Sequence, residues 1–231
     1  MNGFADRRYF LIVPPLTMSK PSTGVVDVWT VPPETIVADP IVVLSPEERG
    51  RMTRRPVDMR EEFARRHAAL RQVVAAYSGV SPAAALVSSP YGCAPRVGGL
   101  EVSMSQSDDV ILIAVASAAV GVDVEGLDAV AGDGHVADVA EMTLSPRELD
   151  RFLALPPADR RRAWARSFAR KEATLKSRGL GLGDVALSEV DVLDDRTGAT
   201  TLVDLKVDDD HVGAVALRNP KALVRWKELA T

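Results

Sequence analysis

The chain has 231 residues, 46% of them hydrophobic and 26% charged, with a formal net charge of −4 at pH 7. It can bury one sizeable core or two small ones. The negative charge argues against nucleic-acid binding through a general basic surface, since neutralising phosphates needs clustered lysine and arginine. A lone cysteine, Cys93, excludes an internal disulfide framework and a multi-cysteine zinc site. No apolar run has the length of a signal h-region or a membrane helix, so we expect a cytoplasmic protein without a membrane partner.

The first part of the chain predicts strands and then a helix. β-branched residues favour strands over residues 9–13 and 25–31. Ser45-Pro46-Glu47-Glu48 has the pattern of a capping box, which opens a short helix that Pro56 ends.

A second helix follows, and after it the pattern becomes extended. Asp58, with Glu61 three residues on, predicts the cap of this helix, and apolar residues between 63 and 77 give it a buried face. The turn-like residues 118–120 mark the junction between two lobes, residues 1–118 and residues 119–231. Short strands are predicted over residues 85–88, 100–104, 110–116 and 121–125.

The second half of the chain repeats the order of helices and strands. A helix is predicted over residues 130–142. Ser145-Pro146-Arg147-Glu148 then repeats the cap pattern found at Ser45, which fits a duplicated lobe, and a long helix from Pro157 ends at Gly179. The strands of a closing sheet are predicted over residues 185–193, 201–207, 212–217 and 223–226.

Acidic and basic residues gather in two of these segments. In a strand over residues 121–125, Asp123 and Glu125 point to the same face, where two acids repel unless a cation joins them. On the long helix Glu172 and Lys176 are four residues apart on one stripe, and Lys171 lies about 100° round from Glu172. Taken singly, each pattern is more typical of a solvated face or a surface ion pair.

Together the two segments resemble the signature of the 4′-phosphopantetheinyl transferases. That signature reads Gly-Val-Asp-Val-Glu at residues 121–125 and, after an aromatic residue, Lys-Glu-Ala at residues 171–173 with a lysine three residues beyond. Residues 44–49, 91–95 and 103–107 are similar to segments of the surfactin-type branch. The resemblance implies an α+β fold, in which a pseudo-twofold pair of similar α/β lobes lies in one polypeptide and coenzyme A binds between them.

The resemblance also implies a chemistry for these residues. Asp123, Glu125 and Glu172 match the acids that bind Mg²⁺, and Glu172 also matches the residue that deprotonates the acceptor serine. Lys176 and Lys171 match phosphate contacts. The expected catalytic residues are therefore Glu172, Lys176 and Asp123.

Further contacts with coenzyme A are implied at the nucleotide end. Gln106 replaces a histidine of the family pattern with a neutral amide. Ala94 stands in place of a lysine, or Cys93 does if the turn is one residue longer, and Glu48 stands where some members carry another basic residue. A charge-assisted hydrogen bond is about twice as strong as a neutral one, so we expect a looser grip there. A solvated helix face is an equally good interpretation for each of the arginines. The implied cofactor-binding residues, beyond the two lysines, are Arg51, Arg54, Arg66, His67, Ser105 and Gln106.

The sequence thus predicts a magnesium-dependent transferase of the holo-acyl-carrier-protein synthase type. It would move 4′-phosphopantetheine from coenzyme A to a serine of an acyl or peptidyl carrier protein, as in polyketide or non-ribosomal peptide synthesis, with release of 3′,5′-ADP. The carrier is expected to dock through an apolar patch with basic residues on the second lobe, and a monomer suffices. One alternative is a non-catalytic module that binds coenzyme A or a carrier. Another is a metal-dependent hydrolase of a different diphosphate.

Overall fold

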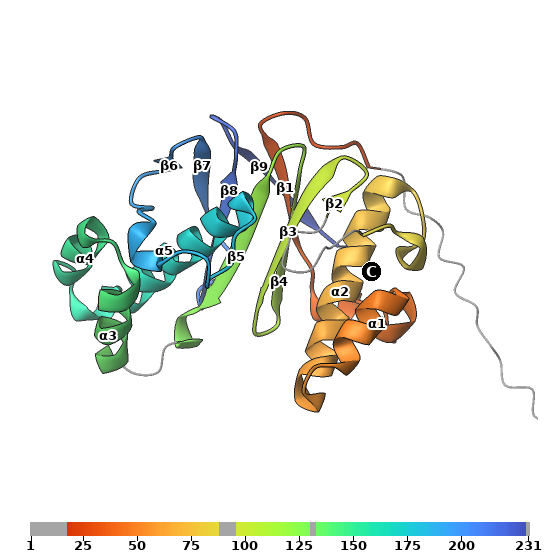
Figure 1. Cartoon of the computed structure of the whole chain (residues 1–231), viewed down its shortest axis with the longest axis horizontal. Helices are drawn as coiled ribbons and strands as arrows, with labels where there is room; N and C mark the ends of the chain where they lie inside the picture. The colour runs from red at the N-terminus through yellow and green to blue at the C-terminus, as the bar shows by residue number, and fades with distance from the viewer. Residues whose placement is uncertain (1–17, 88–95, 130–132, 230–231) are drawn as a thin grey trace, which may run out of the picture.

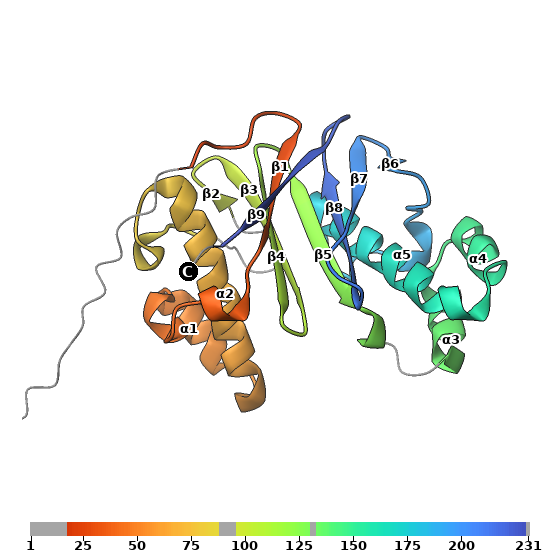
Figure 2. The ribbon, with the colours of Figure 1, turned by 180° about the vertical axis from the view of Figure 1, so that it is seen from behind.

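The protein is described by a computed structural model that covers residues 18–87, 96–129 and 133–229. Two β-sheets pack against each other, and each sheet carries helices on its outer side (Figures 1 and 2). The predicted α+β class with two helix-covered sheets is confirmed. No helix in these ranges combines the length and the apolar character needed to cross a membrane.

The first sheet is built mainly from the N-terminal half. Its strand order is β2-β3-β4-β1-β9, and α1 and α2 lie beside it. The elements are β1 (Val25–Thr30), α1 (Pro46–Thr53), α2 (Arg60–Ser78), β2 (Arg96–Val97), β3 (Leu100–Ser107), β4 (Val110–Ala116) and β9 (Leu223–Glu228).

The second sheet repeats this plan. Its order is β5-β8-β7-β6, with α5 packed along its outer face (Figure 2). The elements are β5 (Val120–Gly126), α3 (Asp133–Thr143), α4 (Pro146–Leu153), α5 (Pro157–Arg178), β6 (Arg196–Thr197), β7 (Thr200–Leu205) and β8 (His211–Leu217).

Alternation along the strands builds the layers. On β4, Leu112 and Ala114 face the core between the sheets, whereas Ile113 faces α2. On β5, Val122 and Val124 enter the same central core, so Asp123 between them faces α5. Helix and strand meet most closely at Gly121, where a Cβ atom would lie 1.9 Å from a carbonyl oxygen of α5. Only glycine permits this approach.

The two lobes correspond with a shift of 100 residues over their helices. Ser45 and Ser145 both form a capping box, as predicted. In each lobe the glutamate of the box is buried and paired with a cation of the next long helix, Glu48 with Arg71 at 2.7 Å and Glu148 with Lys171 at 2.5 Å. Both long helices end at a left-handed glycine, at positions 79 and 179. The sequence showed only the repeated cap pattern, and the structure adds the buried ion pair and the helix-ending glycine to the features that the two lobes share.

Several local predictions were wrong. Asp58 does not cap α2, because a 3₁₀ turn over Val57–Met59 precedes the helix and its N-cap has no side-chain bond. Residues 185–193 contain a 3₁₀ turn at Leu187–Glu189 instead of a strand, and the neighbouring valines pack under α5. Residues 85–87 form no strand either. The predicted strand at 9–13 and residue 88 lie outside the described residues.

The last strand does not close the second sheet as predicted. β9 pairs in parallel with β1 of the first sheet. Arg225 Nε on β9 donates to Asp27 Oδ1 over 2.6 Å, and Asp27 is fully buried. The division of the chain into residues 1–118 and 119–231 stays a prediction. The second of these segments contributes one strand, β9, to the first sheet.

Candidate functional site

A seam of serine side chains joins the two sheets. β3 lies against β5 without a backbone ladder, and alternate serines of β3 bridge the gap. The hydroxyls of Ser103 and Ser107 each accept a backbone N–H of β5 over 3.0 Å. Between them, Ser105 Oγ donates to Asp123 Oδ1 over 2.7 Å. The seam fixes Asp123 between the lobes.

Asp123 is the middle of a buried ion-pair centre. Its side chain is 3% exposed, and Oδ1 also accepts from Lys176 Nζ over 2.6 Å. Lys176 Nζ lies 3.8 Å from Glu172 Oε2. Asp123 Oδ2 is buried and has no hydrogen-bond partner in the described part of the chain. We call Asp123, Glu125, Glu172 and Lys176 the acid centre.

The acid centre has too little positive charge. Burial raises the pKa of Glu125, and the charges of Asp123 and Glu172 raise it further. Burial also raises the pKa of Glu172, although Lys176 opposes that change. Three carboxylates therefore share one ammonium group, and a further cation would relieve them.

The donor set fits a hard divalent cation, although its geometry is not that of a formed metal site. No three His, Cys, Asp or Glu side chains within residues 18–87, 96–129 and 133–229 are grouped to hold a metal ion. The ammonium of Lys176 occupies one oxygen of Asp123. The other oxygen is buried and has no partner in the described part of the chain, and a carboxylate oxygen is a ligand that a hard cation prefers. The metal-binding roles of Asp123, Glu125 and Glu172 stay predictions.

Lys171 does not join the acid centre. Its side chain is fully buried and pairs with Glu148. Its ammonium also donates to the carbonyls of Leu187 and Val190. These three acceptors use all three hydrogens of the group, so its position does not fit the predicted phosphate contact. Lys171 instead holds the turn after α5 against the cap of α4.

Two of the predicted arginines come together at the corner between α1 and α2. Burial lowers the pKa of Arg66. The charge of Glu62 raises this pKa, and the nearby charges of Arg55 and Arg51 lower it. Arg66 Nε is buried without a partner in the described part of the chain. Arg55 lies over the Phe63 ring, with its guanidinium carbon 4.8 Å from the ring centroid. We call Arg51, Arg55 and Arg66 the arginine cluster; it suits an anion, because like charges otherwise repel.

The other residues predicted at this end differ in exposure. Arg54 is exposed, but His67 is buried, with its ring stacked on Phe63 at a centroid distance of 3.8 Å. Burial lowers the pKa of His67 to about 4, so its ring is neutral at pH 7. A neutral ring inside the helix packing does not fit the predicted direct contact with coenzyme A.

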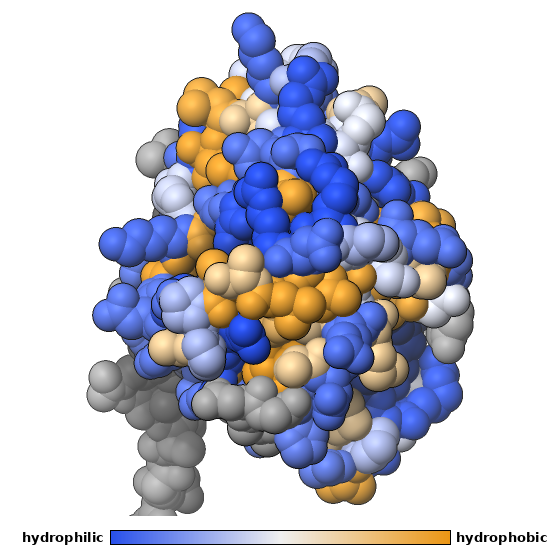
Figure 3. Space-filling view, turned by 90° about the vertical axis from the view of Figure 1, so that its left-hand side faces the viewer, coloured by the Kyte–Doolittle hydropathy of each residue, from blue (hydrophilic) through white to orange (hydrophobic). Residues whose placement is uncertain are grey.

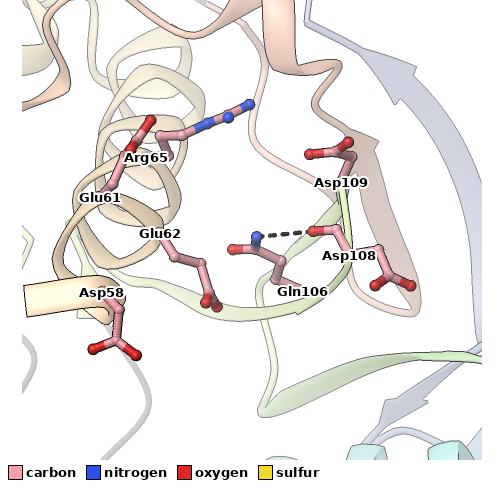
Figure 4. A pocket seen from close by; sticks show the side chains of 7 residues that line it. All are labelled: Asp58, Glu61, Glu62, Arg65, Gln106, Asp108 and Asp109. Atoms are coloured by element: carbon pink, nitrogen blue, oxygen red, sulfur yellow. Dashed lines mark hydrogen bonds between the residues drawn. The ribbon is translucent and has the colours of Figure 1, made fainter. Parts of the chain in front are cut away.

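Gln106 lies on the opposite face of β3 from Ser105, in an acidic pocket (Figure 4). Its Nε2 donates to the carbonyl of Asp108 over 3.0 Å. Five carboxylates and one guanidinium disfavour a phosphate group here. The pocket has a volume of about 420 Å³ and is lined by Asp58, Glu61, Glu62, Arg65, Gln106, Asp108 and Asp109. Ser105 and Gln106 are adjacent in the sequence, but Ser105 contacts the acid centre and Gln106 lines the acidic pocket.

Sequence reasoning missed two features of this region. Arg55 belongs to the arginine cluster, and its position four residues after Arg51 was the available signal. The buried partner of Lys171 was also missed, although the 100-residue shift aligns Lys171 with Arg71 and Glu148 with Glu48.

Comparison with known proteins points to one family. Residues 119–220, which include the whole acid centre, match the model of the 4′-phosphopantetheinyl transferase superfamily. The chain is also 28% identical over 209 residues to the 4′-phosphopantetheinyl transferase HetI of Nostoc sp. (strain PCC 7120 / SAG 25.82 / UTEX 2576). That alignment covers 83% of this chain and 87% of the relative.

Proposed function

We propose that the chain is a member of the 4′-phosphopantetheinyl transferase superfamily and that it transfers 4′-phosphopantetheine from coenzyme A to a serine of an acyl or peptidyl carrier protein. The observation that carries this proposal is the acid centre, in which Asp123, Glu172 and Lys176 converge beside the seam of the two sheets. We assign the protein to the surfactin-type branch and the holo-acyl-carrier-protein synthase type, acting as a cytoplasmic monomer.

The acid centre would hold Mg²⁺ through Asp123 Oδ2, Glu125 and Glu172. The raised pKa of both glutamates and the unpartnered oxygen of Asp123 support this assignment. When bound, Mg²⁺ neutralises charge on the diphosphate of coenzyme A.

Glu172 and Lys176 have separate roles in the transfer. The hydroxyl oxygen of the carrier serine attacks the phosphorus on the pantetheine side, and the bond from that phosphorus to 3′,5′-ADP breaks. Glu172 takes the proton of the hydroxyl; its place on α5 one turn before Lys176, and beside the buried Asp123, puts its carboxylate where the serine and the diphosphate would meet. Lys176 is one turn further along α5 and would hold the phosphate oxygens as a point charge.

The arginine cluster supplies the counter-charge at the nucleotide end. The charges of Arg55 and Arg51 lower the pKa of Arg66, and the negative charge of a bound phosphate monoester would oppose that repulsion. We therefore assign the 3′-phosphate of coenzyme A to this cluster. The acidic pocket beside Gln106 is a poor place for it, since its carboxylates repel a phosphate.

Mass spectrometry of an apo-carrier protein tests the proposal. Incubation with coenzyme A, Mg²⁺ and the enzyme should raise the carrier mass by one phosphopantetheine, and EDTA should prevent the increase. Tight binding of coenzyme A without any mass increase across several carriers would favour the non-catalytic module instead. Release of 3′,5′-ADP without a carrier would indicate a hydrolase.

A further inference from the structure

Two acids of the acid centre lie on a strand that borders the first lobe. The outer side of the second lobe, where α3 and α4 lie, carries hydrophilic side chains around an apolar area (Figure 3). On the inner side of that lobe, β5 is the edge strand of the second sheet, so alternate N–H groups of β5 have no ladder partner. Serines of β3, in the first lobe, accept two of them, those of Val122 and Gly126. The backbone of β5 is therefore held from the first lobe.

The two acids on β5 are fixed in different ways. Asp123 is fixed through its side chain, by the hydrogen bond from Ser105 Oγ over 2.7 Å. Glu125 is the residue before the last of β5, and the N–H that follows it belongs to Gly126. That N–H donates to Ser107 Oγ over 3.0 Å, so this contact fixes the peptide group that ends Glu125. The direction of the Glu125 side chain depends on this peptide group, because both are attached to the same α-carbon.

Gly126 lets the turn between β3 and β4 come this close. A Cβ atom at Gly126 would lie 3.0 Å from Asp108 Oδ2 and 3.2 Å from Ser107 Oγ. Asp108 is the first residue of the turn, and its φ of 51° lies in the left-handed region that favours glycine. Aspartate tolerates this region better than most residues do, but glycine would be easier. The contacts of its carboxylate, and not the turn itself, therefore explain an aspartate here.

The carboxylate of Asp108 reaches a histidine of the second lobe. Its Oδ2 lies 3.4 Å from His211 Nε2, which is longer than a good hydrogen bond but within the range of an ion pair. The other ring nitrogen, Nδ1, lies 2.9 Å from Asp208 Oδ1. A shift of 100 residues relates Asp108 to Asp208, which lies in the turn between β7 and β8. We call Asp108, His211 and Asp208 the clasp, because they join the equivalent turns of the two lobes.

We propose that Ser107 is a positioning residue for Glu125, and that the clasp holds Ser107 in place. This rests on the proposed function, because it takes Glu125 as a ligand of Mg²⁺. The first lobe supplies none of the three acids, yet its turn sets the direction of one of them. The position equivalent to Ser107 in the second lobe is Val207, which has no hydroxyl group, so this contact is not a general feature of the repeated fold.

Binding of Mn²⁺ tests the role of Ser107. Mn²⁺ prefers the same oxygen ligands as Mg²⁺, and its free-ion EPR signal is lost on binding. The Kd should be measured without a carrier, on the protein alone and with one equivalent of coenzyme A, after subtraction of binding to coenzyme A itself. Ser107→Ala should raise the Kd by about tenfold, since loss of a group that orients a metal ligand commonly costs about 10- to 100-fold in affinity.

Two further variants separate positioning from loss of structure. Ser107→Thr keeps the hydroxyl group and should restore most of the affinity for Mn²⁺. Ser78→Ala is the matched control, because it removes a serine hydroxyl that donates to a backbone carbonyl in the last turn of α2. The Kd of this control should equal that of the wild type.

A smaller change tests the clasp. Asp108→Asn removes the carboxylate that faces His211 and keeps a residue type that tolerates a positive φ. Because a partly exposed ion pair contributes little, the Kd for Mn²⁺ should rise by only about two- to fivefold. Asp109→Asn is the matched control, since it removes the same charge one residue further along the turn, and its Kd should not rise.

The outcomes separate this inference from the proposed function. If the wild type binds Mn²⁺ and Ser107→Ala binds it equally well, or if Ser78→Ala weakens binding as much, Ser107 is not a positioning residue. If Ser107→Ala does not fold, Asp108→Asn decides, and a Kd equal to that of Asp109→Asn overturns the inference. If the wild type does not bind Mn²⁺, or if Asp123→Asn binds it as tightly, the Mg²⁺ site of the proposed function is contradicted and the inference falls with it.

Discussion

The two lobes share a scaffold, yet only one of them carries the acid centre. The order β1-β4-β3-β2 in the first sheet corresponds to β5-β8-β7-β6 in the second, with β9 added to the first alone, and the long helices correspond with a shift of 100 residues. The counterparts of Glu172 and Lys176 are Gln72, which donates to the carbonyl of Thr35, and the buried Ala76. The first lobe thus uses for packing the helix face that the second lobe uses for charge.

The strands show the same difference. Val26 pairs with Ala116 as Val120 pairs with Leu217, so three residues further on Trp29 corresponds to Asp123. Trp29 is buried and donates to the hydroxyl of Tyr77. Different residues at a few equivalent positions therefore give the first lobe a buried apolar cluster and the second lobe the acid centre.

The largest expected effect is the loss of the base in the second lobe. Glu172→Gln removes the carboxylate that takes the serine proton, and the transfer rate should fall by about 10²- to 10⁴-fold. The matched change in the first lobe, Gln72→Ala, should leave the rate near that of the wild type. Single-turnover rates with saturating coenzyme A and carrier measure both. Equal losses in the two variants would mean that the lobes do not differ in this way.

The next effect concerns the buried ion pairs, which both lobes share. Lys171→Met and Arg71→Met each leave a buried glutamate unpaired and should lower the free energy of unfolding by about 3–5 kcal/mol. Lys171→Arg copies the first lobe and should retain most of the stability. Urea denaturation measures the losses. If Lys171→Met keeps its stability but binds coenzyme A more weakly, Lys171 contacts a phosphate of coenzyme A, as the sequence predicted, and the structural assignment is wrong.

A smaller effect, dependent on pH, distinguishes His67 from its counterpart Ser167. The folded pKa of His67 is about 4, below the 6.5 of an unperturbed histidine, because the ring is buried. Between pH 6.5 and pH 4 the unfolded chain therefore binds a proton that the folded chain does not. This costs about 3 kcal/mol of stability by pH 4, at 1.36 kcal/mol per pKa unit, and nothing above pH 6.5. The free energy of unfolding of His67→Asn should fall less steeply than that of the wild type over this range, and parallel curves would reject the assignment.

The smallest effect tests the missing positive charge of the acid centre. Lys176→Met leaves Asp123, Glu125 and Glu172 without their ammonium group, so Mg²⁺ at millimolar concentration should raise the midpoint of thermal unfolding more in this variant than in the wild type. A difference of about 2–4 °C is expected for each kcal/mol of added stabilisation. Lys206→Met, at an exposed position, is the control. Equal shifts in all three proteins would argue against a cation site here.

Local signals predicted much of the fold. The two capping boxes were predicted from four residues each, and the strands at 100–104, 110–116 and 121–125 were also predicted correctly. Residues 185–193 were not, because their valines favour a strand locally while the turn carbonyls bind Lys171. The sheet that β9 joins depends on a pairing nearly 200 residues away, with β1, which no local pattern records.

The candidate site was also predictable in part, because its motifs are local in the sequence. Asp123, Glu172 and Lys176 were recognised from motif spacing, and the structure brings them together; their chemical roles stay predictions. The resemblance assigned Lys171 and Gln106 to the coenzyme A site, whereas Lys171 pairs with Glu148 and Gln106 lies on the opposite face of β3 from Ser105. Neighbours in sequence separate when helix or strand geometry turns them to different faces.

The mass of an apo-carrier protein after incubation with coenzyme A and Mg²⁺ tests the central claim most directly. It should be measured with the wild type, with Asp123→Asn in the second lobe and with Gln72→Ala in the first. We predict a gain of one phosphopantetheine with the wild type and with Gln72→Ala, and none with Asp123→Asn. No gain with the wild type, or an equal gain with Asp123→Asn, would contradict the account.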